Sequence, residues 1–428
     1  EQLLQNHLNS MGSYMSLWQD SMSRFMGKSG AEEGDNKPTD RRFKHEAWES
    51  NPFFDFIKQS YLMGADAILK TVSNIEGLDE KAAHKLEFYT RQFVDAMSPS
   101  NFALTNPEVL EHALQTQGQN LVRGFQNFCK DFDPGTGQLQ ISMADKEAFK
   151  LGVNIATTPG QVIYQNDLMQ LIQYSPSTET VYKTPLLIVP PWINKYYVLD
   201  LQPKNSMIKW LVAQGYTVFV ISWINPDENH SEIDFEDYIF DGLITAMDAI
   251  EESTGEHEVN AVGYCIGGTL LAAALSYLKA KQDERIKSAT FFVTMIDFAD
   301  PGDLGVYIDE QQVKSLENKM NEKGYHDGKD MAMSFNMLRS NDLIWSFYVN
   351  NYLLGKEPLP FDLLYWNSDS TRMPAKMHST YLRKMYLENS FKDKGGISID
   401  DVPIDVSSID TPAYFISTED DHIAPWIS

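Results

Sequence analysis

The segment Gly263-Tyr264-Cys265-Ile266-Gly267 has the spacing of a nucleophile elbow in which cysteine replaces serine. In such an elbow the glycines allow a sharp strand-to-helix turn, which raises the central side chain above a sheet. Residues 259–262 read as a short buried strand and residues 270–275 as an apolar helix. A helix N-terminus favours the thiolate, a strong nucleophile toward acyl groups. We therefore expect Cys265 to be an acyl-transfer nucleophile; a merely packed cysteine in a glycine-rich turn stays open as the alternative.

Acyl transfer at an elbow also requires an oxyanion hole. One donor in this arrangement is the N–H that follows the nucleophile, here that of Ile266. The second donor comes from the loop after an earlier strand, where Pro190-Pro191-Trp192-Ile193-Asn194 stands. Proline has no N–H to donate, so the N–H of Trp192 or that of Ile193 is the candidate.

The catalytic acid is expected at the C-terminal end of a late strand, where Asp297 and the pair Asp420-Asp421 both qualify. We favour Asp421, because its strand follows a long interruption of the strand–helix alternation and a histidine should come next. Only His422 does, and neighbouring side chains of an extended segment point to opposite sides. We expect His422 to brace the acid loop and the catalytic base to lie beyond Ser428, so no catalytic histidine is assigned in this chain.

Strands and helices alternate from about residue 184 onward. The predicted strands are 186–189, 216–223, 259–262 and 286–296, and the predicted helices are 205–214, 235–253 and one from 270. Such alternation implies parallel strands with crossover helices, and an elbow after the third strand matches the α/β-hydrolase plan. The alternation stops after Asp297 for about a hundred residues, and a strand resumes at 411–417.

Three regions follow from this pattern. Residues 1–150 are predicted to form a mainly helical N-terminal domain, and residues 151–428 an α/β-hydrolase domain with a cap insertion at about 299–409. The insertion is rich in aromatic residues, so the cap would exclude water and bind an apolar chain. The same aromatic residues could equally form the core of the cap itself.

Composition narrows the class of protein further. The chain has 428 residues and a formal net charge of −25, which argues against nucleic-acid binding. Its two cysteines indicate a reducing compartment without disulfides; Cys129 is expected to be packed in a helix over 121–130. The uncharged run 259–278 is broken by glycines, so we interpret it as strand, turn and helix instead of a transmembrane segment. No signal-peptide pattern is visible, and we expect a cytoplasmic protein.

Several further segments resemble the class I poly(3-hydroxyalkanoate) synthases, the polymerases of bacterial storage polyester. They extend from about residue 40 to the C-terminus. The segments are Asp40-Arg41-Arg42-Phe43 followed by Trp48, Val189 to Tyr197, Ser222 to Pro226, Gly263 to Thr269, Trp366 to Thr371, and Asp421 to Trp426.

This resemblance implies that Cys265 attacks the thioester of an (R)-3-hydroxyacyl-CoA, releases CoA and carries the growing polyester as a thioester. Asp421 would match the family's catalytic aspartate, which helps to activate the 3-hydroxyl, whereas the family's histidine lies in a Gly-His motif beyond this sequence. The elbow with Tyr264 and Ile266 resembles that of class I members, which usually prefer short monomers such as 3-hydroxybutyryl-CoA. The resemblance also implies no metal or cofactor, a homodimer through the cap region, and a place at the surface of cytoplasmic polyester granules.

Two other functions remain as hypotheses. The elbow alone does not separate transfer from hydrolysis, so the alternative is a cysteine-nucleophile α/β-hydrolase acting as an esterase, a thioesterase or an intracellular polyester depolymerase. A third hypothesis is a non-catalytic granule scaffold with a relic elbow. Polymer formation measured against release of free hydroxyacid separates the first two.

Overall fold

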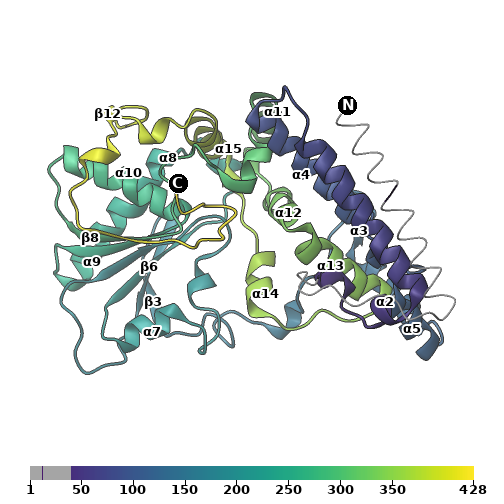
Figure 1. Ribbon diagram of the computed structural model, residues 1–428. Helices are drawn as coiled ribbons and strands as arrows, with labels where there is room; N and C mark the ends of the chain where they lie inside the picture. Colours follow the sequence, from purple (N-terminus) through teal and green to yellow (C-terminus); the bar gives the residue numbers. More distant parts are fainter. Residues whose placement is uncertain (1–11, 13–39) are drawn as a thin grey trace. The chain divides into compact units, whose positions relative to one another are not determined.

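The computed structural model describes residue 12 and residues 40–428, which divide into two compact units (Figure 1). The helical unit contains residues 40–145 together with residues 336–359, and the sheet unit contains residues 146–335 and 360–428. The segment 336–359, which lies inside the predicted cap insertion, therefore belongs to the same compact unit as the N-terminal helices. Residues 1–11 and 13–39 of the predicted N-terminal domain lie outside the described residues.

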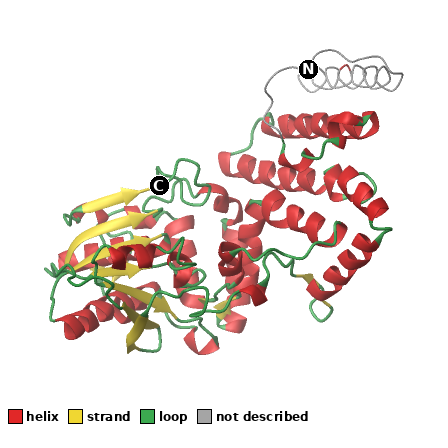
Figure 2. Cartoon of the chain, turned by 90° about the horizontal axis from the view of Figure 1, so that it is seen from below, coloured by secondary structure: helices red, strands yellow, loops and turns green. Residues whose placement is uncertain are grey.

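Some helices of the helical unit begin at a side-chain N-cap, and Figure 2 shows helices in red. Asn51 and Asn106 each accept a backbone N–H at a helix start, and each precedes a proline at the first helical position, where its missing N–H costs nothing. The helices are α2 (Ala47–Ser50), α3 (Pro52–Ser73), α4 (Glu80–Ala96), α5 (Pro107–Gln115), α6 (Gln119–Asp131) and α13 (Ser346–Tyr348). A hairpin of β1 (Phe132–Asp133) and β2 (Gln138–Leu139) follows α6.

Helix α6 packs through a polar face. Asn120 and Asn127 donate side-chain N–H groups to the carbonyl oxygens of Leu353 (2.9 Å) and Asn351 (3.2 Å). Between them, a Cβ on Gly124 would lie 1.8 Å from the carbonyl oxygen of Tyr352, so only glycine fits there. The opposite face is exposed and contains Leu121, Val122, Phe125 and Cys129. The expectation that Cys129 is packed is therefore wrong.

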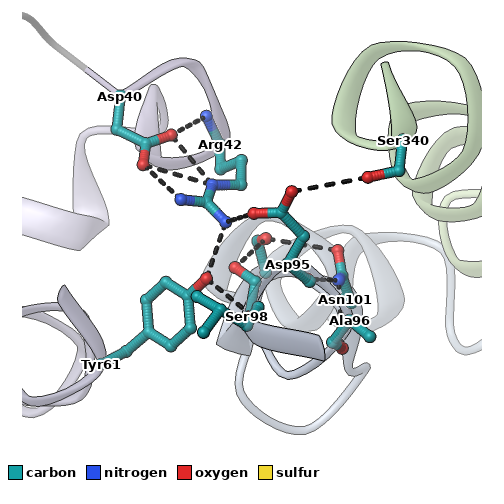
Figure 3. Close-up of polar contacts among 10 residues, drawn as sticks. Asp40, Arg42, Tyr61, Asp95, Ala96, Ser98, Asn101 and Ser340 are labelled. Carbon is teal, nitrogen blue, oxygen red and sulfur yellow. Dashed lines mark hydrogen bonds and ion pairs between the residues drawn. The ribbon is translucent and has the colours of Figure 1, made fainter. Parts of the chain in front are cut away.

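Arg42 is the centre of a charged network in the helical unit (Figure 3). Its guanidinium pairs with Asp40 at 2.7 Å, donates to the Tyr61 hydroxyl at 2.7 Å and pairs with Asp95 at 3.1 Å. Ser340, from the segment 336–359, donates to the second oxygen of Asp95 at 3.4 Å. Arg42 thus joins its own segment to α3 and α4, and its partner Asp95 joins α4 to the segment 336–359.

Replacing Arg42 with methionine should destabilise the helical unit, because Asp95 is buried and would lose its cationic partner. Hydrogen bonds to charged groups contribute about 1.5–3 kcal/mol, so the expected loss in free energy of unfolding is of that size. Arg41→Met is the matched control, since Arg41 is exposed and adjacent in sequence. Urea denaturation followed by circular dichroism measures both; equal stability of the two variants would contradict the role given to Arg42.

The sheet unit contains a seven-stranded sheet within the described residues, in the order β13-β8-β7-β5-β6-β4-β3. Its strands are β3 (Gly160–Gln165), β4 (Met169–Tyr174), β5 (Leu186–Val189), β6 (Val218–Trp223), β7 (Val259–Tyr264), β8 (Ile286–Phe292) and β13 (Ala413–Ile416). The strands from β13 to β6 are parallel, whereas β4 and β3 continue the sheet as antiparallel strands.

Alternating side chains of the central strands bury two apolar layers. Leu187, Val189 and Ala261 pack on one face with α9 (Thr245–Thr254) and α10 (Ile266–Ala280). Leu186 and Ile188 face the other way, toward α7 (Met207–Ala213). Figure 1 shows α10 and α7 on opposite sides of the sheet. Helices on both faces are what a parallel sheet requires, because both of its faces are apolar.

The remaining elements of the sheet unit are short helices and two pairs of short strands. The helices are α8 (Phe235–Asp237), α11 (Glu310–Lys323), α12 (Gly328–Leu338, which ends in the helical unit), α14 (Asp362–Ser368) and α15 (Ala375–Thr380). β9 (Tyr325–His326) pairs antiparallel with β10 (Met373–Pro374) far along the chain, and only β11 (Ser398–Ile399) and β12 (Val402–Pro403) form a hairpin among these four described strands.

The predicted α/β-hydrolase fold with a helical N-terminal region is confirmed, and each predicted strand overlaps an observed one. The antiparallel strands β3 and β4 were not predicted. Every residue of β3 is at least partly exposed, so that strand lacks the apolar run by which the central strands were identified. Across residue 12 and residues 40–428, none of the helices combines the length and apolar character needed to cross a membrane.

Candidate active site

The predicted elbow joins β7 to α10, with Cys265 at the turn. Cys265 has φ 54° and ψ −126°, a positive φ that is strained for a residue with a side chain. Hydrogen bonds maintain the turn: the Cys265 N–H donates to the carbonyl of Phe292 on β8 (2.9 Å), and its carbonyl accepts from Gly268 (2.8 Å). This backbone geometry is the one that presents a nucleophile at the end of a sheet.

Glycines are required at the elbow because the backbone packs there without room for side chains. A Cβ on Gly263 would lie 2.5 Å from the Cα of Gly268. A Cβ on Gly267 would lie 2.2 Å from the carbonyl oxygen of Val189, the last residue of β5. The first turn of α10 therefore lies directly against the loop that follows β5.

That loop contains the predicted second oxyanion donor. Trp223 donates its ring N–H to the carbonyl of Pro190 (2.8 Å), and Thr371 donates its hydroxyl to the carbonyl of Trp192 (2.6 Å). Neither the N–H of Trp192 nor that of Ile193 has a hydrogen-bond acceptor among the described residues. Both donors therefore remain candidates, and their assignment as oxyanion donors stays a prediction.

The next residues of the loop are bound to the segment 366–371. Trp366 donates its ring N–H to the carbonyl of Lys195 (2.7 Å), and the Lys195 ammonium pairs with Asp369 (2.9 Å). The Tyr197 hydroxyl donates to the other oxygen of Asp369 (2.8 Å). Two segments that carry the resemblance, far apart in sequence, are thus one hydrogen-bonded structure beside the elbow.

The Cys265 thiol is protonated in this environment. Burial raises its pKa to about 11; the N–H of Ile266 opposes that increase, and the charge of Asp421 adds to it. The N–H at the helix N-terminus favours the thiolate, as expected, but the loss of hydration outweighs it, so the net thiolate character that was expected is absent. Ile266 does have its N–H toward the sulfur, where an oxyanion donor belongs.

Asp421 lies close enough to Cys265 for its charge to act on the thiol. One carboxylate oxygen accepts the N–H groups of Ile423 and Ala424, both at 2.9 Å, which positions the side chain. The other oxygen accepts no hydrogen bond from any described residue. Asp421 is therefore placed as the sequence predicted, although its catalytic role stays a prediction.

Asp297, the other candidate acid, has its own partners away from the thiol. It accepts hydrogen bonds from Asn389 (2.7 Å) and from the N–H of Ala299 (2.9 Å), and pairs with Lys392 (3.0 Å). Although burial opposes it, these contacts hold the pKa of Asp297 below its ordinary value. We interpret Asp297 as a structural residue.

His422 makes a backbone contact that fits the bracing role expected for it. Its carbonyl accepts the N–H of Asp303 at 2.8 Å, and Gly302 passes so close that a Cβ there would lie 2.4 Å from the same oxygen. Among the described residues, no histidine is hydrogen-bonded to Cys265.

An apolar cavity of about 120 Å³ lies in the sheet unit. Ile193 lines it, as do Tyr381 and Tyr386, whose pKa values burial raises and the nearby Cys265 raises further. Two residues of the cavity wall thus lie near Cys265, and a third belongs to the loop that follows β5. The other residues that line it include Leu304, Ile308, Val313, Leu316, Met331, Phe335, Met373 and Leu382.

Two cavity residues, His326 and His378, were not predicted from the sequence. Tyr381 and Tyr386 belong to the aromatic-rich insertion, for which both a cap function and a packed core were open. A signal was present: His378, Tyr381 and Leu382 have helical spacing, which puts them on one face. The residue that completes the pair, His326, comes from β9, and nothing in the sequence connects it to that face.

Comparison with known proteins gives the family. Residues 39–211 match the model described as "Poly-beta-hydroxybutyrate polymerase (PhaC) N-terminus", and residues 184–428 match that of the alpha/beta hydrolase fold. A poly(3-hydroxyalkanoate) polymerase of Methylorubrum extorquens is 51% identical over all of this chain and 71% of its own length. The chain belongs to the poly(3-hydroxyalkanoate) polymerase family. Its members are acyltransferases, and the predicted enzyme class is confirmed.

Other relatives agree. The polymerase subunit PhaC of Rhizobium meliloti is 50% identical over 98% of this chain and 68% of its own length. The polymerase subunit PhaC of Cupriavidus necator is 39% identical over 97% of this chain and 70% of its own length. A solved meta-cleavage product hydrolase from Pseudomonas fluorescens shares 12% identity with a TM-score of 0.33, over 64% of this chain and 84% of that one. A similarity that low carries no argument about function.

The raised pKa of Cys265 predicts how fast its thiol is alkylated. In a Cys129→Ser background, which removes the exposed thiol, iodoacetamide should modify Cys265 about tenfold faster for each pH unit between 7 and 9, since only the thiolate reacts. Intact-protein mass spectrometry follows the modification. A rate that levels off below pH 9 would contradict a pKa of about 11.

Removing the charge of Asp421 should make Cys265 more reactive toward the same reagent. Asp421→Asn takes away a carboxylate that disfavours the thiolate, so alkylation at pH 8 should become about threefold to tenfold faster. Asp420→Asn is the matched control, because Asp420 is the exposed neighbour and does not act on the thiol. Slower alkylation of Asp421→Asn would show that the carboxylate activates the thiol directly.

Proposed function

We propose that this protein polymerises short-chain (R)-3-hydroxyacyl-CoA, such as 3-hydroxybutyryl-CoA, into polyhydroxyalkanoate through a covalent thioester on Cys265. The observation that carries the proposal is the cysteine elbow itself: a thiol at a strained turn, beside backbone donors and an apolar cavity. Membership of the polymerase family supports the choice of acyl donor and product.

In the first step the Cys265 sulfur attacks the thioester carbonyl, and the negative charge on that oxygen is stabilised by the N–H of Ile266 and one from Trp192 or Ile193. The tetrahedral intermediate collapses, the bond to the CoA sulfur breaks, and CoA leaves as the protonated thiol. The bond broken and the bond formed are both thioesters, so the exchange is nearly neutral in energy.

The acylation step needs a base. With a pKa of about 11, only about one Cys265 thiol in 10⁴ is ionised at pH 7. A positioned base that accepts the thiol proton typically contributes about 10²–10⁴-fold, which is the size of this deficit. Asp421 does not favour the thiolate, so its carboxylate fits the second step better.

In the second step a 3-hydroxyl attacks the acyl-Cys265 thioester, forming an ester and returning the thiol. Asp421 would assist removal of the hydroxyl proton, acting with the base. Its orientation by Ile423 and Ala424 leaves one oxygen without a partner for that task. The cavity lined by Tyr381 and Tyr386 would hold the acyl chain and keep water from the thioester.

We further propose that the enzyme needs no metal or cofactor, acts as a homodimer through the cap region, and works at the surface of polyester granules in the cytoplasm. The family resemblance supports these points. CoA enters only as part of the substrate.

Cys265→Ala should abolish release of CoA from (R)-3-hydroxybutyryl-CoA, because no other group at the elbow can form the acyl intermediate. Cys129→Ser is the control and should keep most activity, since Cys129 is exposed in the helical unit. A thiol assay measures CoA, and chromatography separates polymer from free 3-hydroxybutyrate. CoA release with free acid and no polymer would instead identify a thioesterase.

Asp421→Asn should slow elongation more than the first acylation, by about 10²–10⁴-fold. The variant would still form acyl-Cys265, detectable by mass, and would accumulate short oligomers. Asp297→Asn is the control, and it should lose stability more than turnover. Stalled elongation in Asp297→Asn together with normal turnover in Asp421→Asn would reverse the two assignments.

A further inference from the structure

Two histidines form a pair in the wall of the apolar cavity. Their Nδ1 atoms lie 3.1 Å apart, and the rings are stacked with centroids 4.8 Å apart and an interplanar angle of 20°. His326 lies on β9, and His378 lies on α15 and is buried. Both line the cavity, whose wall is otherwise mostly apolar.

The pair is neutral and has a defined pattern of donors and acceptors. Burial lowers the pKa of both rings, that of His378 most strongly; Asp330 and Asp327 only partly offset this for His326. In a neutral pair one Nδ1 carries the hydrogen that the other accepts. One ring must then carry its second hydrogen on Nε2, while the other ring has a lone pair on Nε2.

Those Nε2 atoms are left for an occupant of the cavity. Among the described residues neither of them has a hydrogen-bond partner. An occupant that hydrogen-bonds to both atoms is favoured over an apolar one, which would remove them from water without supplying a partner. Since one Nε2 donates and the other accepts, the matching group is one that does both, which is a property of a hydroxyl.

The pair shares the cavity wall with two tyrosines that lie near Cys265. Tyr381 and Tyr386 are the cavity residues that interact with Cys265. His378 precedes Tyr381 by three residues in a continuous helical segment, one turn or about 5 Å along the axis. An acyl group bound to Cys265 and extending past Tyr381 would therefore bring its first substituents toward the histidines.

We propose that His326 and His378 form a subsite that binds the free hydroxyl of a 3-hydroxyacyl group. This inference rests on the proposed function and adds a specificity determinant to it. The subsite distinguishes a hydroxyacyl thioester from a plain acyl thioester of the same length, because the unsubstituted chain leaves both Nε2 atoms without partners.

The test compares acylation of Cys265 by three thioesters: (R)-3-hydroxybutyryl-CoA, butyryl-CoA, and (R)-3-acetoxybutyryl-CoA, whose esterified oxygen accepts but does not donate. The complete protein is used in single-turnover reactions, followed by CoA release and intact mass. The wild-type protein should prefer the hydroxyl compound. His378→Phe should raise the concentration for half-maximal acylation by the hydroxyl compound about tenfold, and leave that for butyryl-CoA within about twofold.

Two further variants make the result specific. His378→Gln introduces a side-chain amide that can both donate and accept, so this variant should show part of the wild-type preference for the hydroxyl compound. It also serves as the test variant if His378→Phe does not fold. His257→Phe is the matched control, because His257 is an exposed histidine of the same unit that pairs with Glu251. His257→Phe should show the wild-type preference among the three thioesters.

Three results would overturn the proposal. One is an unchanged preference in both His378 variants, and another is an equal loss with all three thioesters, which a purely structural role would produce. A wild-type protein that accepts the acetoxy compound as well as the hydroxyl compound would exclude recognition of a free hydroxyl. If no thioester acylates wild-type Cys265, the proposed function itself fails, and this inference fails with it; the other three outcomes leave acylation of Cys265 intact.

Discussion

The contact between Gly267 and the carbonyl oxygen of Val189 is the constraint on which the site depends. A Cβ at Gly267 would lie 2.2 Å from that oxygen, so the first turn of α10 can reach the end of β5 only as bare backbone. In the sheet, Val189 is directly paired with Gly263 on the strand that enters the elbow. Cys265 and the loop after β5 therefore start from neighbouring points of the sheet, and neither can shift without the other.

The thiol at this turn is not activated at rest. Burial raises the pKa of Cys265 more than the Ile266 N–H lowers it. A low-dielectric setting also strengthens hydrogen bonds to an oxyanion once one forms. Under the proposed function, such a neutral thiol would react only once substrate and base are both in place.

Much of the sheet unit could be predicted, because the central strands are apolar runs with clear stops and the elbow requires its glycines. β3 was missed because its side chains are at least partly exposed and give no such run. In α6 the spacing of apolar residues predicted the wrong buried face. The helix buries Asn120, Gly124 and Asn127, and it exposes the apolar face that contains Cys129. The polar face packs because its amides find backbone carbonyls, which is information from the partner segment that no single helix contains.

Long-range pairs set the limit of prediction at the site as well. Asp421 could be placed from the order of strands, whereas His326 and His378 are 52 residues apart and meet only through the pairing of β9 with β10. The structural role of the segment 366–371 likewise depends on a long-range contact, because Asp369 binds Lys195 and Tyr197. The insertion after β8 does more than cover the sheet, because its residues bind the loop that follows β5 and line the cavity. Under the proposed function, substitutions in it would change the choice of acyl group without touching the elbow.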